Sequence, residues 1–570
     1  MSIENRGLRF EAPDSDHWSL DAVHCSAPVT AYHAENLVAH TKDANRPGFE
    51  IFGMPVEGYE YAVVNRFPYY RVKFIGSKKG RKKLPPRWLF KLWLFFHPEI
   101  RKRFKIASKL HETKPWKEYL RRWEREIKPE AIKTHLHLQS IDPKGLDDSD
   151  LIDHIKECAK NGTLQYCQHH ALTPYAYYSI GDYMAQVQAW TGLSFFHLLE
   201  ALHYDDEYIQ IGVDKEFEEL LRELREDKDA RHILYSGQTS EEIFDQLKHH
   251  SDRLHRLLGS WLDMVGYRIA SGYDIADFYA LERPDLLIHM LRAGLTQAPH
   301  QKTLKTAREL SAKIREKVPL EHQATYDELY ADACEVLSLK EERALYTYLW
   351  SYGLLRRALL AAGERLAQAG AIAHAEDIVD ASIDEITGLL ERRPSISLQE
   401  LSERVKYRKT VSIKSAPLSL GERRSVPLEW FPIYVQRPLQ ALKAVVACRQ
   451  AKEEPVEELP KEELSKIRGL PASQGIYEGR ACVIEGPEDF EQLEKGDILV
   501  SHHTSEAYNV ILPLIGALVT DAGGVLSHAA TVSREYGIPA VVGTHTATSV
   551  IKSGMRIQVD GNNGQVKVII

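Results

Sequence analysis

Apolar residues recur at intervals of three and four along much of the first 450 residues. This spacing places them on one face of an α-helix, and it predicts helices over residues 215–227, 241–265, 285–295, 303–316 and 342–370. The last segment ends on Gly370, and glycine is common just beyond a helix C-terminus. Residues 56–75 instead alternate aromatic and β-branched positions, which is typical of a short β-hairpin. Long helices without alternating strands indicate a mostly α-helical region.

A different pattern begins near residue 467. Short apolar runs punctuated by glycine, proline and asparagine predict strands at residues 497–500, 517–520, 540–543, 556–560 and 566–570. Among them we expect one clear helix, over residues 528–536, which Gly537 and Pro539 would end. The sequence therefore predicts an α+β multidomain protein, in which a large, mostly α-helical domain (residues 1–450) precedes a small α/β domain (residues 467–570).

Residues 451–466 separate these two patterns. They contain six glutamates, three lysines and two prolines, with almost nothing to bury in a core. Such a composition is typical of a solvated, semi-stiff linker. An exposed helix held by Glu–Lys pairs is the alternative, but Pro455 and Pro460 argue against one continuous helix.

Composition and charge narrow the class of protein. With 44% hydrophobic and 27% charged residues, the chain has ordinary globular composition. Its net charge of −8 does not suit a dedicated nucleic-acid-binding protein, which is usually basic. Six dispersed cysteines without a C-x-x-C pair, and histidines without metal-ligand spacing, predict neither disulfides nor a metal site. We expect a cytoplasmic protein without membrane contact, because the N-terminus lacks an apolar signal core and the longest apolar runs reach about half of the roughly 20 residues that span a bilayer.

A glycine-rich segment of the predicted small domain carries the most specific chemistry. A strand is expected to end at Thr520, Gly523 and Gly524 allow tight turns, and Ser527 can cap the following helix. His528 then lies in the first turn of that helix, where free backbone N–H groups and the helix dipole favour anions. The same position disfavours imidazolium and keeps a ring nitrogen available as a nucleophile. A histidine that attacks a phosphoryl group and then carries it needs both properties, although a capping histidine beside an ordinary turn is the alternative.

This segment resembles the signature of the swivelling phosphohistidine domain of the phosphoenolpyruvate-utilising enzymes. The resemblance continues upstream through Gly469-x-Pro-Ala-Ser-x-Gly475 and Gly496-Asp-Ile-Leu-Val500, so it covers about residues 467–570. It implies that His528 is the phosphoryl carrier. The family often shows Thr-Asp-Pro where this chain has Thr504-Ser505-Glu506. Five residues of the motif would support the histidine loop: Thr520, Gly523, Gly524, Ser527 and Arg534. Further matching residues are Ala529, Ala530, Glu535, Gly537, Ile538, Pro539, Ala540, Val541 and Gly543.

The helical part is similar, more faintly, to the substrate domain of rifampicin-phosphotransferase-like proteins. We find no G-x-x-x-x-G-K-[ST] phosphate loop, and we expect no phosphoenolpyruvate-binding barrel, for which the chain leaves no room. The resemblance therefore implies an acceptor-binding and carrier chain, like the His-domain subunit of phenylphosphate synthase, whose partner is a separate ATP-grasp nucleotide-binding subunit that holds ATP and Mg²⁺. The matching segments are Asp16-His-Trp18, Ala27-Pro-Val-Thr30, Leu355-Arg-Arg-Ala-Leu-Leu360, Gly370, Glu376-Asp-Ile378 and Asp384-Glu-Ile386.

By this resemblance, the chain belongs to an ATP-dependent phosphotransferase that moves the β-phosphoryl group of ATP through His528 to a small organic hydroxyl compound. Aromatic residues over 166–190 suggest an aromatic acceptor. Aromatic core packing, and arginines on solvated helix faces, are the alternatives for the candidate acceptor site. Two other functions stay open: a self-contained phosphotransferase with an unrecognised nucleotide site, and a non-catalytic scaffold that retains the swivelling fold. The acceptor-site candidates are His169, His170, Tyr175, Tyr178, Arg343, Arg356 and Arg357.

A strongly basic segment, residues 71–110, holds 14 lysines and arginines and one acidic residue, Glu99. Three interpretations compete: a solvated amphipathic helix, a docking site for an acidic partner subunit, and contact with nucleic acid or a membrane surface. The acidic net charge of the whole chain disfavours the last. The aromatic residues interleaved with the basic ones are Phe74, Trp88, Phe90, Trp93, Phe95, Phe96 and Phe104.

Overall fold

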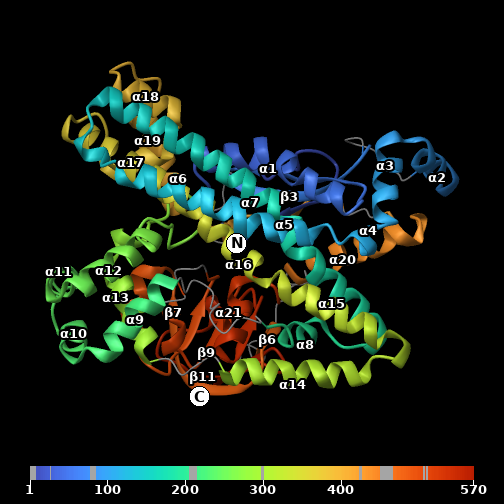
Figure 1. The fold of residues 1–570 in the computed structure, drawn as a ribbon. Coiled ribbons are helices and arrows are strands. Elements are labelled where there is room, and N and C mark those ends of the chain that lie inside the picture. Colours follow the sequence, from blue (N-terminus) through green and yellow to red (C-terminus); the bar gives the residue numbers. More distant parts are fainter. Residues whose placement is uncertain are drawn as a thin grey trace. The chain divides into compact units, whose positions relative to one another are not determined.

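The computed structural model of the chain describes residues 8–25, 27–77, 85–203, 215–296, 301–422, 426–449, 466–504, 508 and 511–569. The chain forms two compact units (Figure 1). The first unit comprises residues 1–178, 273–277 and 343–442, and the second comprises residues 179–272, 278–342 and 443–570. The predicted small domain therefore belongs to one unit together with helices from the middle of the chain, and its separate boundary stays a prediction.

An antiparallel sheet of four strands lies in the first unit. In order, the strands are β2 (Val56–Val64), β3 (Phe67–Phe74), β1 (Trp18–Leu20) and β4 (Ser419–Leu420). β2 and β3 confirm the hairpin predicted over residues 56–75. Asn65 and Arg66, with φ of 50° and 62°, form its two-residue turn, a geometry that matches the twist of paired strands.

Helix α1 (Ala31–Ile51) packs against β2 and is absent from the sequence prediction. Its buried face includes polar residues such as Asn36 and Asn45, so no continuous apolar stripe marks it in the sequence. A Cβ on its Gly48 would lie only 2.6 Å from Cγ of Pro174 in α7 (Asp148–Thr191). Glycine at this position therefore lets the two helices approach closely.

The other helices confirm the mostly α-helical character of the first unit, with one correction. The single helix predicted over residues 342–370 is wrong, because the chain leaves the helical conformation at Thr347 (φ −111°, ψ −107°). Two helices result, α16 (Leu337–Tyr346) and α17 (Tyr348–Gln368), and α7, α16 and α20 (Ile433–Arg449) contribute residues to both units. Among the described helices, none has the length and apolarity to cross a bilayer. The remaining helices of this unit are α2 (Arg87–Phe96), α3 (Pro98–Ala107), α4 (Leu110–Thr113), α5 (Trp116–Arg122), α6 (Lys128–Ser140), α18 (Ile383–Leu390) and α19 (Leu398–Thr410).

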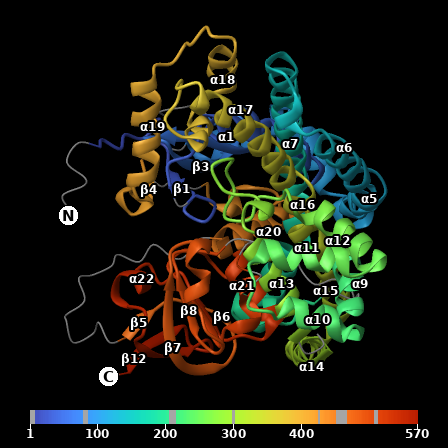
Figure 2. The same ribbon diagram turned by 90° about the vertical axis from the view of Figure 1, so that its left-hand side faces the viewer.

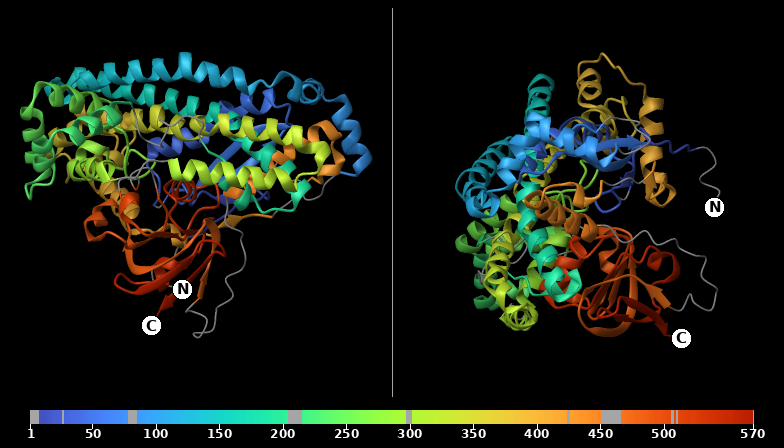
Figure 3. Two further views of the ribbon diagram at one scale, coloured as in Figure 1. Left: turned by 60° about the horizontal axis from the view of Figure 1, so that its bottom comes forward. Right: turned by 90° about the vertical axis from the view of Figure 1, so that its right-hand side faces the viewer.

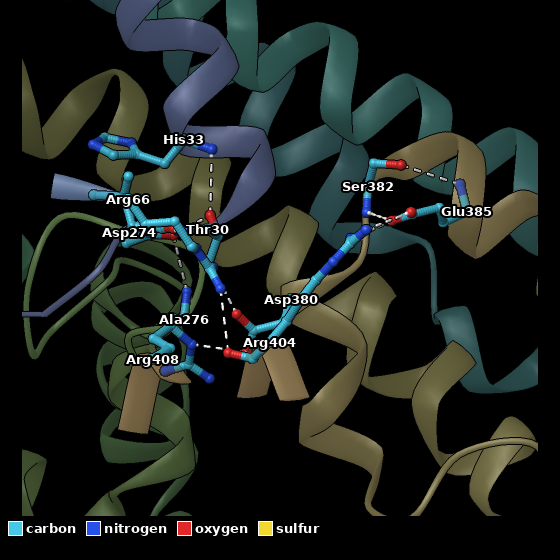
Figure 4. A network of polar contacts seen from close by, with 11 residues as sticks. Thr30, His33, Arg66, Asp274, Ala276, Asp380, Ser382, Glu385, Arg404 and Arg408 are labelled. Carbon is cyan, nitrogen blue, oxygen red and sulfur yellow. Dashed lines mark hydrogen bonds and ion pairs between the residues drawn. The ribbon is translucent and has the colours of Figure 1, made fainter. Parts of the chain in front are cut away.

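A buried carboxylate joins distant segments of the first unit (Figure 4). Asp380 is fully buried and accepts hydrogen bonds of 2.8 Å from Nη2 of Arg66 and from Nε of Arg408. Close by, the carboxylate of Asp274 accepts from the backbone N–H (2.9 Å) and the hydroxyl (2.6 Å) of Thr30. A buried charge is costly unless it is paired. Losing one of these contacts would therefore be unfavourable, so they hold the β2–β3 turn, α19 and the start of α1 in place.

Helices dominate the first part of the second unit, and most were predicted. Residues 195–200, 228–234 and 323–335 form helices that the sequence did not predict. The single helix predicted over 241–265 is wrong, since the chain becomes extended at Ser251 (φ −156°) and forms two helices there. The hydroxyl of Ser251 accepts from the backbone N–H of Leu254 at 3.1 Å and caps the second helix. The helices are α8 (Phe195–Glu200), α9 (Lys215–Glu226), α10 (Lys228–Leu234), α11 (Ser240–His250), α12 (Asp252–Val265), α13 (Pro284–Thr296), α14 (Gln301–Lys317) and α15 (Gln323–Glu335).

An eight-stranded sheet completes the second unit, in the order β5-β12-β11-β7-β8-β9-β10-β6. β7, β8, β9 and β10 are parallel, and the outer pairings are antiparallel. Figure 2 shows α21 (His528–Tyr536) and α22 (Ala547–Val550) beside the strands. All five predicted strands are present to within one residue. The strands are β5 (Lys466–Arg468), β6 (Leu470–Ser473), β7 (Ile476–Ile484), β8 (Ile498–Ser501), β9 (Ala517–Thr520), β10 (Ala540–Val542), β11 (Arg556–Asp560) and β12 (Gln565–Ile569).

These elements confirm the predicted α+β class, a mostly helical chain with a small sheet-containing C-terminal region. The predicted linker over residues 451–466 lies outside the described residues, except for Lys466, which begins β5.

Candidate phosphohistidine site

The loop between β9 and α21 positions the predicted carrier histidine. α21 begins at His528, and the hydroxyl of Ser527 accepts from the backbone N–H of Ala530 at 3.4 Å. The helix ends at Gly537, whose φ of 63° is left-handed. The predicted helix, its cap and its end are therefore confirmed. His528 occupies the first helical position, where unpaired backbone N–H groups gather.

Gly523 has a conformation that only glycine adopts readily. Its φ is 106°, and a Cβ there would lie 2.9 Å from Oγ of Ser527. Gly524 acts through its backbone, because its carbonyl accepts from the N–H of Ser527 at 2.9 Å. At the start of the loop, the hydroxyl of Thr520 donates to the carbonyl of Ala522 at 2.8 Å. These contacts shape the loop that presents the histidine.

Asp521 holds the base of this loop, and the sequence argument missed it. Its buried carboxylate accepts from the hydroxyl of Thr544 at 2.9 Å and from the hydroxyl of Thr548. Burial raises the pKa of Asp521, but the nearby ring of His502, whose Nδ1 lies 3.9 Å away, and hydrogen bonds from Thr548 and Thr544 outweigh it and lower the pKa below its usual value. An ionised carboxylate therefore anchors the loop to the start of α22.

Arg534, predicted to support the loop, reaches it through the backbone. Its Nη1 donates to the carbonyl of Val525 at 2.9 Å and to that of Ala472 in β6 at 3.0 Å. Burial lowers the pKa of Arg534, while the carboxylate of Glu200 on α8 raises it. The guanidinium thus joins the loop before His528 to an edge strand of the sheet.

The ring of His528 has one bonded and one unbonded nitrogen. Nδ1 lies 3.0 Å from Oγ1 of Thr504, which follows β8 and keeps the threonine of the family's Thr-Asp-Pro motif. Nε2 is buried and has no hydrogen-bond partner among the described residues. The pKa of His528 is lowered to about 4, mainly by burial; Glu341 opposes this shift and Lys340 adds to it. The ring is therefore neutral near pH 7.

Lys340 and Glu341, on α16, place two charged groups near the ring of His528. Nζ of Lys340 lies 3.3 Å from Oγ1 of Thr531 and forms an ion pair with Glu341. Thr531 is three residues beyond His528 on α21, so the two share a face of the helix. All four residues belong to the second unit. The sequence does not reveal this pair, because charged neighbours are common on helices and no local pattern marks these two.

Tyr175 and Tyr178, two predicted acceptor residues, lie in an aromatic cluster of the first unit. Tyr175 stacks on Tyr119 with ring centroids 3.9 Å apart, and Tyr178 stacks on Phe52 at 4.2 Å. Trp116 completes the cluster, 5.4 Å from Tyr178. Burial raises the pKa of Tyr175 far above its usual value, so the phenol stays protonated. This packing matches the alternative of an aromatic core.

The predicted histidines have aromatic neighbours of their own. His169 lies 4.7 Å from the ring of Tyr348, and His170 lies 4.4 Å from the ring of Tyr166. Both histidines are half-buried on α7.

The three predicted arginines already have protein contacts. The Arg343 guanidinium lies 5.1 Å from the ring of Tyr177. Nη1 of Arg356 donates to two carbonyls of the segment 273–277, at 3.2 Å each, and Nη1 of Arg357 donates to a carbonyl at the end of α6 at 2.8 Å. These arginines and the four aromatic and histidine candidates belong to the first unit, and His528 belongs to the second. Their role as acceptor ligands stays a prediction.

Within the described residues, no group of three or more histidine, cysteine, aspartate or glutamate side chains is arranged to hold a metal ion.

Several known proteins are similar to the chain. Residues 493–564 match the family described as "PEP-utilising enzyme, mobile domain". The chain is 28% identical over 345 residues to an uncharacterised phosphotransferase, YvkC, of Bacillus subtilis (strain 168), an alignment that covers 59% of this chain and 39% of that protein. It is 29% identical over 319 residues to the rifampicin phosphotransferase of the same organism, covering 54% of this chain and 34% of the relative.

A shorter stretch gives a higher identity. Over 126 residues, 22% of this chain and 17% of the relative, the identity to a probable phosphoenolpyruvate synthase of Archaeoglobus fulgidus is 44%. The aligned part thus spans well under half the length of each of these relatives. The chain is a relative of the phosphoenolpyruvate-utilising enzymes and carries their mobile domain in its C-terminal region.

Proposed function

We propose that this chain is the acceptor-binding and phosphohistidine-carrier part of an ATP-dependent phosphotransferase. His528 takes the β-phosphoryl group of ATP and passes it to the hydroxyl of a small organic acceptor. Overall, ATP, water and the acceptor become AMP, inorganic phosphate and a phosphomonoester. The observation that carries this proposal is the neutral, buried Nε2 of His528 at the N-terminus of α21, without a partner among the described residues. The relatives' names, phosphotransferase and phosphoenolpyruvate synthase, support the same class of reaction.

Nε2 is the nucleophile of the first half-reaction. When the ring proton sits on Nδ1 and is donated to Thr504, the lone pair lies on Nε2. Nε2 attacks the β-phosphorus, and the bond from that phosphorus to the oxygen shared with the α-phosphate breaks, which releases AMP. Water then removes the γ-phosphoryl group as inorganic phosphate, and one phosphoryl group remains on nitrogen.

Two features favour a phosphoryl group at this position. The first turn of α21 offers unpaired backbone N–H groups and the positive end of the helix dipole. The ammonium of Lys340, paired with Glu341 and held at Thr531 one turn further along, brings a charged hydrogen-bond donor into a buried setting. Groups already held in place for the developing charge stabilise a transition state without reorganisation.

The second half-reaction hands the phosphoryl group to the acceptor. The acceptor hydroxyl oxygen attacks phosphorus, the O–P bond forms, the N–P bond breaks, and the hydroxyl proton leaves to a base. We place acceptor binding in the first unit, where His169 and His170 are the candidate bases and Arg343, Arg356 and Arg357 the candidate phosphoryl ligands. Aromatic side chains around both histidines favour an aromatic acceptor.

The nucleotide half of the reaction is assigned to a separate ATP-grasp subunit that binds ATP with Mg²⁺. Phosphoenolpyruvate-utilising relatives are much longer than the aligned part, which spans 39% and 34% of two of them. Those relatives therefore contain sequence that this chain does not match, and a partner subunit is the proposed source of the missing function.

Residues 467–570 move as the carrier domain in this proposal, and residues 451–466 permit the motion. Contacts within the second unit would open as it leaves. Besides the Lys340–Thr531 contact, the backbone N–H of Leu526 donates to the carbonyl of Cys448 at 3.2 Å, and Glu200 accepts from the backbone N–H of Gln474 at 3.1 Å.

The test is transfer of labelled phosphate to the full chain in an extract of cells that produce it. ATP labelled at the β-phosphate should give an acid-labile, alkali-stable label on the wild-type chain and on the control His545→Ala, and no label on His528→Ala. Label retained by His528→Ala, or label arriving from the γ-phosphate alone, would contradict the proposal.

A further inference from the structure

Helix α2 turns an apolar face to solvent. Trp88, Phe95 and Phe96 are 68%, 67% and 65% exposed, and Leu89 and Leu92 are exposed beside them. Among the described residues, these three are the only exposed tryptophan and phenylalanine side chains. Contiguous exposed apolar surface of this kind marks a site of interaction rather than ordinary surface.

The opposite face of α2 fixes the helix to the first unit. Phe90 and Leu94 are buried, and the ring of Phe90 lies 5.5 Å from the rings of both Trp430 and Phe431. The outer aromatic residues are therefore held outward by a helix that is packed in place. They cannot fold back without breaking this contact.

The apolar surface continues at the start of α20. Ile433 is 79% exposed and Tyr434 is exposed beside it. The ring of Tyr434 lies 6.2 Å from that of Phe104 on α3. Figures 1 and 3 show α2 and α3, in blue, beside the orange start of α20.

Positive charge is concentrated on α2, on α3 and just beyond α3. Lys102 pairs with Glu50 at 2.5 Å, and Glu99 accepts from Nε of the buried Arg103 at 2.9 Å. Glu99 is the only acidic residue from 87 to 109. The six exposed basic residues of this stretch are Arg87, Lys91, Arg101, Lys102, Lys105 and Lys109.

We propose that α2 and the start of α20 insert into the interface of an anionic lipid bilayer. Tryptophan and phenylalanine on one face of a helix, with lysine and arginine around them, are the composition of helices that lie in the plane of the headgroups. Four of the six basic residues are lysines. Lysine is depleted in protein–protein interfaces, whereas anionic lipid headgroups attract it. A membrane surface therefore fits better than an acidic protein partner. This proposal replaces the expectation of no membrane contact.

Vesicle flotation of the full chain tests the proposal. The chain should float with vesicles of phosphatidylcholine mixed with phosphatidylglycerol, much less with phosphatidylcholine alone, and less as salt is raised. Trp88→Ser with Phe95→Ser should reduce binding about tenfold or more, because apolar burial is lost. Lys91→Glu with Arg101→Glu should reduce it by a similar factor. The matched control is Leu320→Ser, a site 82% exposed in another part of the chain, which should bind like the wild type.

Equal flotation of the wild type and the Trp88→Ser, Phe95→Ser variant, with both shown to be folded by circular dichroism, would overturn the proposal. A chain that does not float with the anionic vesicles would also overturn the proposal. That result is the one expected if α2 binds an acidic protein instead. His528→Ala should float normally, so this result is independent of the phosphotransfer chemistry.

Discussion

The hydroxyl of Thr504 lies 3.0 Å from Nδ1 of His528 and is its hydrogen-bond partner. Thr504 follows β8 and His528 begins α21, so two neighbouring parallel strands deliver the pair to the same edge of the sheet. The contact orients the imidazole and, when Nδ1 carries the proton, leaves Nε2 free to react. Thr504 has this position although the residues after it depart from the family motif.

Replacing Thr504 by valine should slow phosphorylation of His528. The ring loses the hydrogen bond that orients it, and a loss of about 1.4 kcal/mol corresponds to roughly tenfold in rate. Thr504→Ser keeps the hydroxyl and should stay within about threefold of the wild type. Single-turnover labelling measures both rates, and equal rates for valine and wild type would show that the contact has no role.

His528 should make unfolding depend on pH. Burial lowers the pKa of His528 from 6.5 to about 4. As the pH falls from 6.5 towards 4, the unfolded chain takes up a proton that the folded chain does not, so the free energy of unfolding decreases. Chemical denaturation at several pH values should show a smaller decrease in His528→Asn than in the wild type. The control His255→Asn, an exposed position on α12, should follow the wild type.

Removing the positive charge of Lys340 should impair transfer more than binding. Lys340→Met is expected to lower the rate of phosphoryl transfer roughly 100-fold, the scale seen when one fixed donor to a developing charge is lost. Lys340→Arg should recover part of it, whereas Lys313→Met, an exposed lysine on α14, should have no effect. Single-turnover rates measure the effect on transfer, and thermal denaturation shows whether each variant is folded. Together they separate the loss of the Lys340 charge from a structural defect. A normal rate in Lys340→Met would remove the residue from the mechanism.

Docking of the predicted carrier domain should weaken as pH rises through 7. The pKa of Glu200 is raised to about 7, because burial outweighs the opposing effects of Arg534 and of the contacts from Gln474. The protonated form suits the docked position, so its stabilisation is present at low pH and is lost as the group ionises. Hydrogen exchange of the β6–β7 turn at pH 6 and pH 8 should show more opening at the higher pH. Glu200→Gln should abolish the difference, and an unchanged difference would point to another group.

Gly523→Ala should lower stability and histidine labelling more than Gly554→Ala does. Both glycines have left-handed φ, 106° and 91°, but only the Cβ at 523 meets a neighbour, Ser527, whereas the space around 554 is open. Strain alone costs about 1 kcal/mol at each site, and the contact displaces the cap of α21 in addition. Denaturation and histidine labelling should both be more affected at 523. Equal effects on labelling would mean that the loop tolerates the extra atom.

Local signals explain why part of the site was predictable. Ser527 and Gly537 act on backbone groups within four residues of themselves, so the ends of α21, and with them the position of His528, could be predicted. The same reasoning failed at Ser251 and Thr347. The apolar period runs on through both positions, and neither glycine nor proline marks the break.

The sequence by itself determined the helix that begins at His528, the predicted nucleophile, and most strands, because caps, turns and periodicity depend on neighbours along the chain. The tertiary structure alone decided what surrounds the nucleophile. Lys340 meets Thr531 across 191 residues, and Arg534 meets Ala472 across 62. No spacing rule predicts such pairs, and the low pKa of His528 follows from burial, which exists only once the chain has folded.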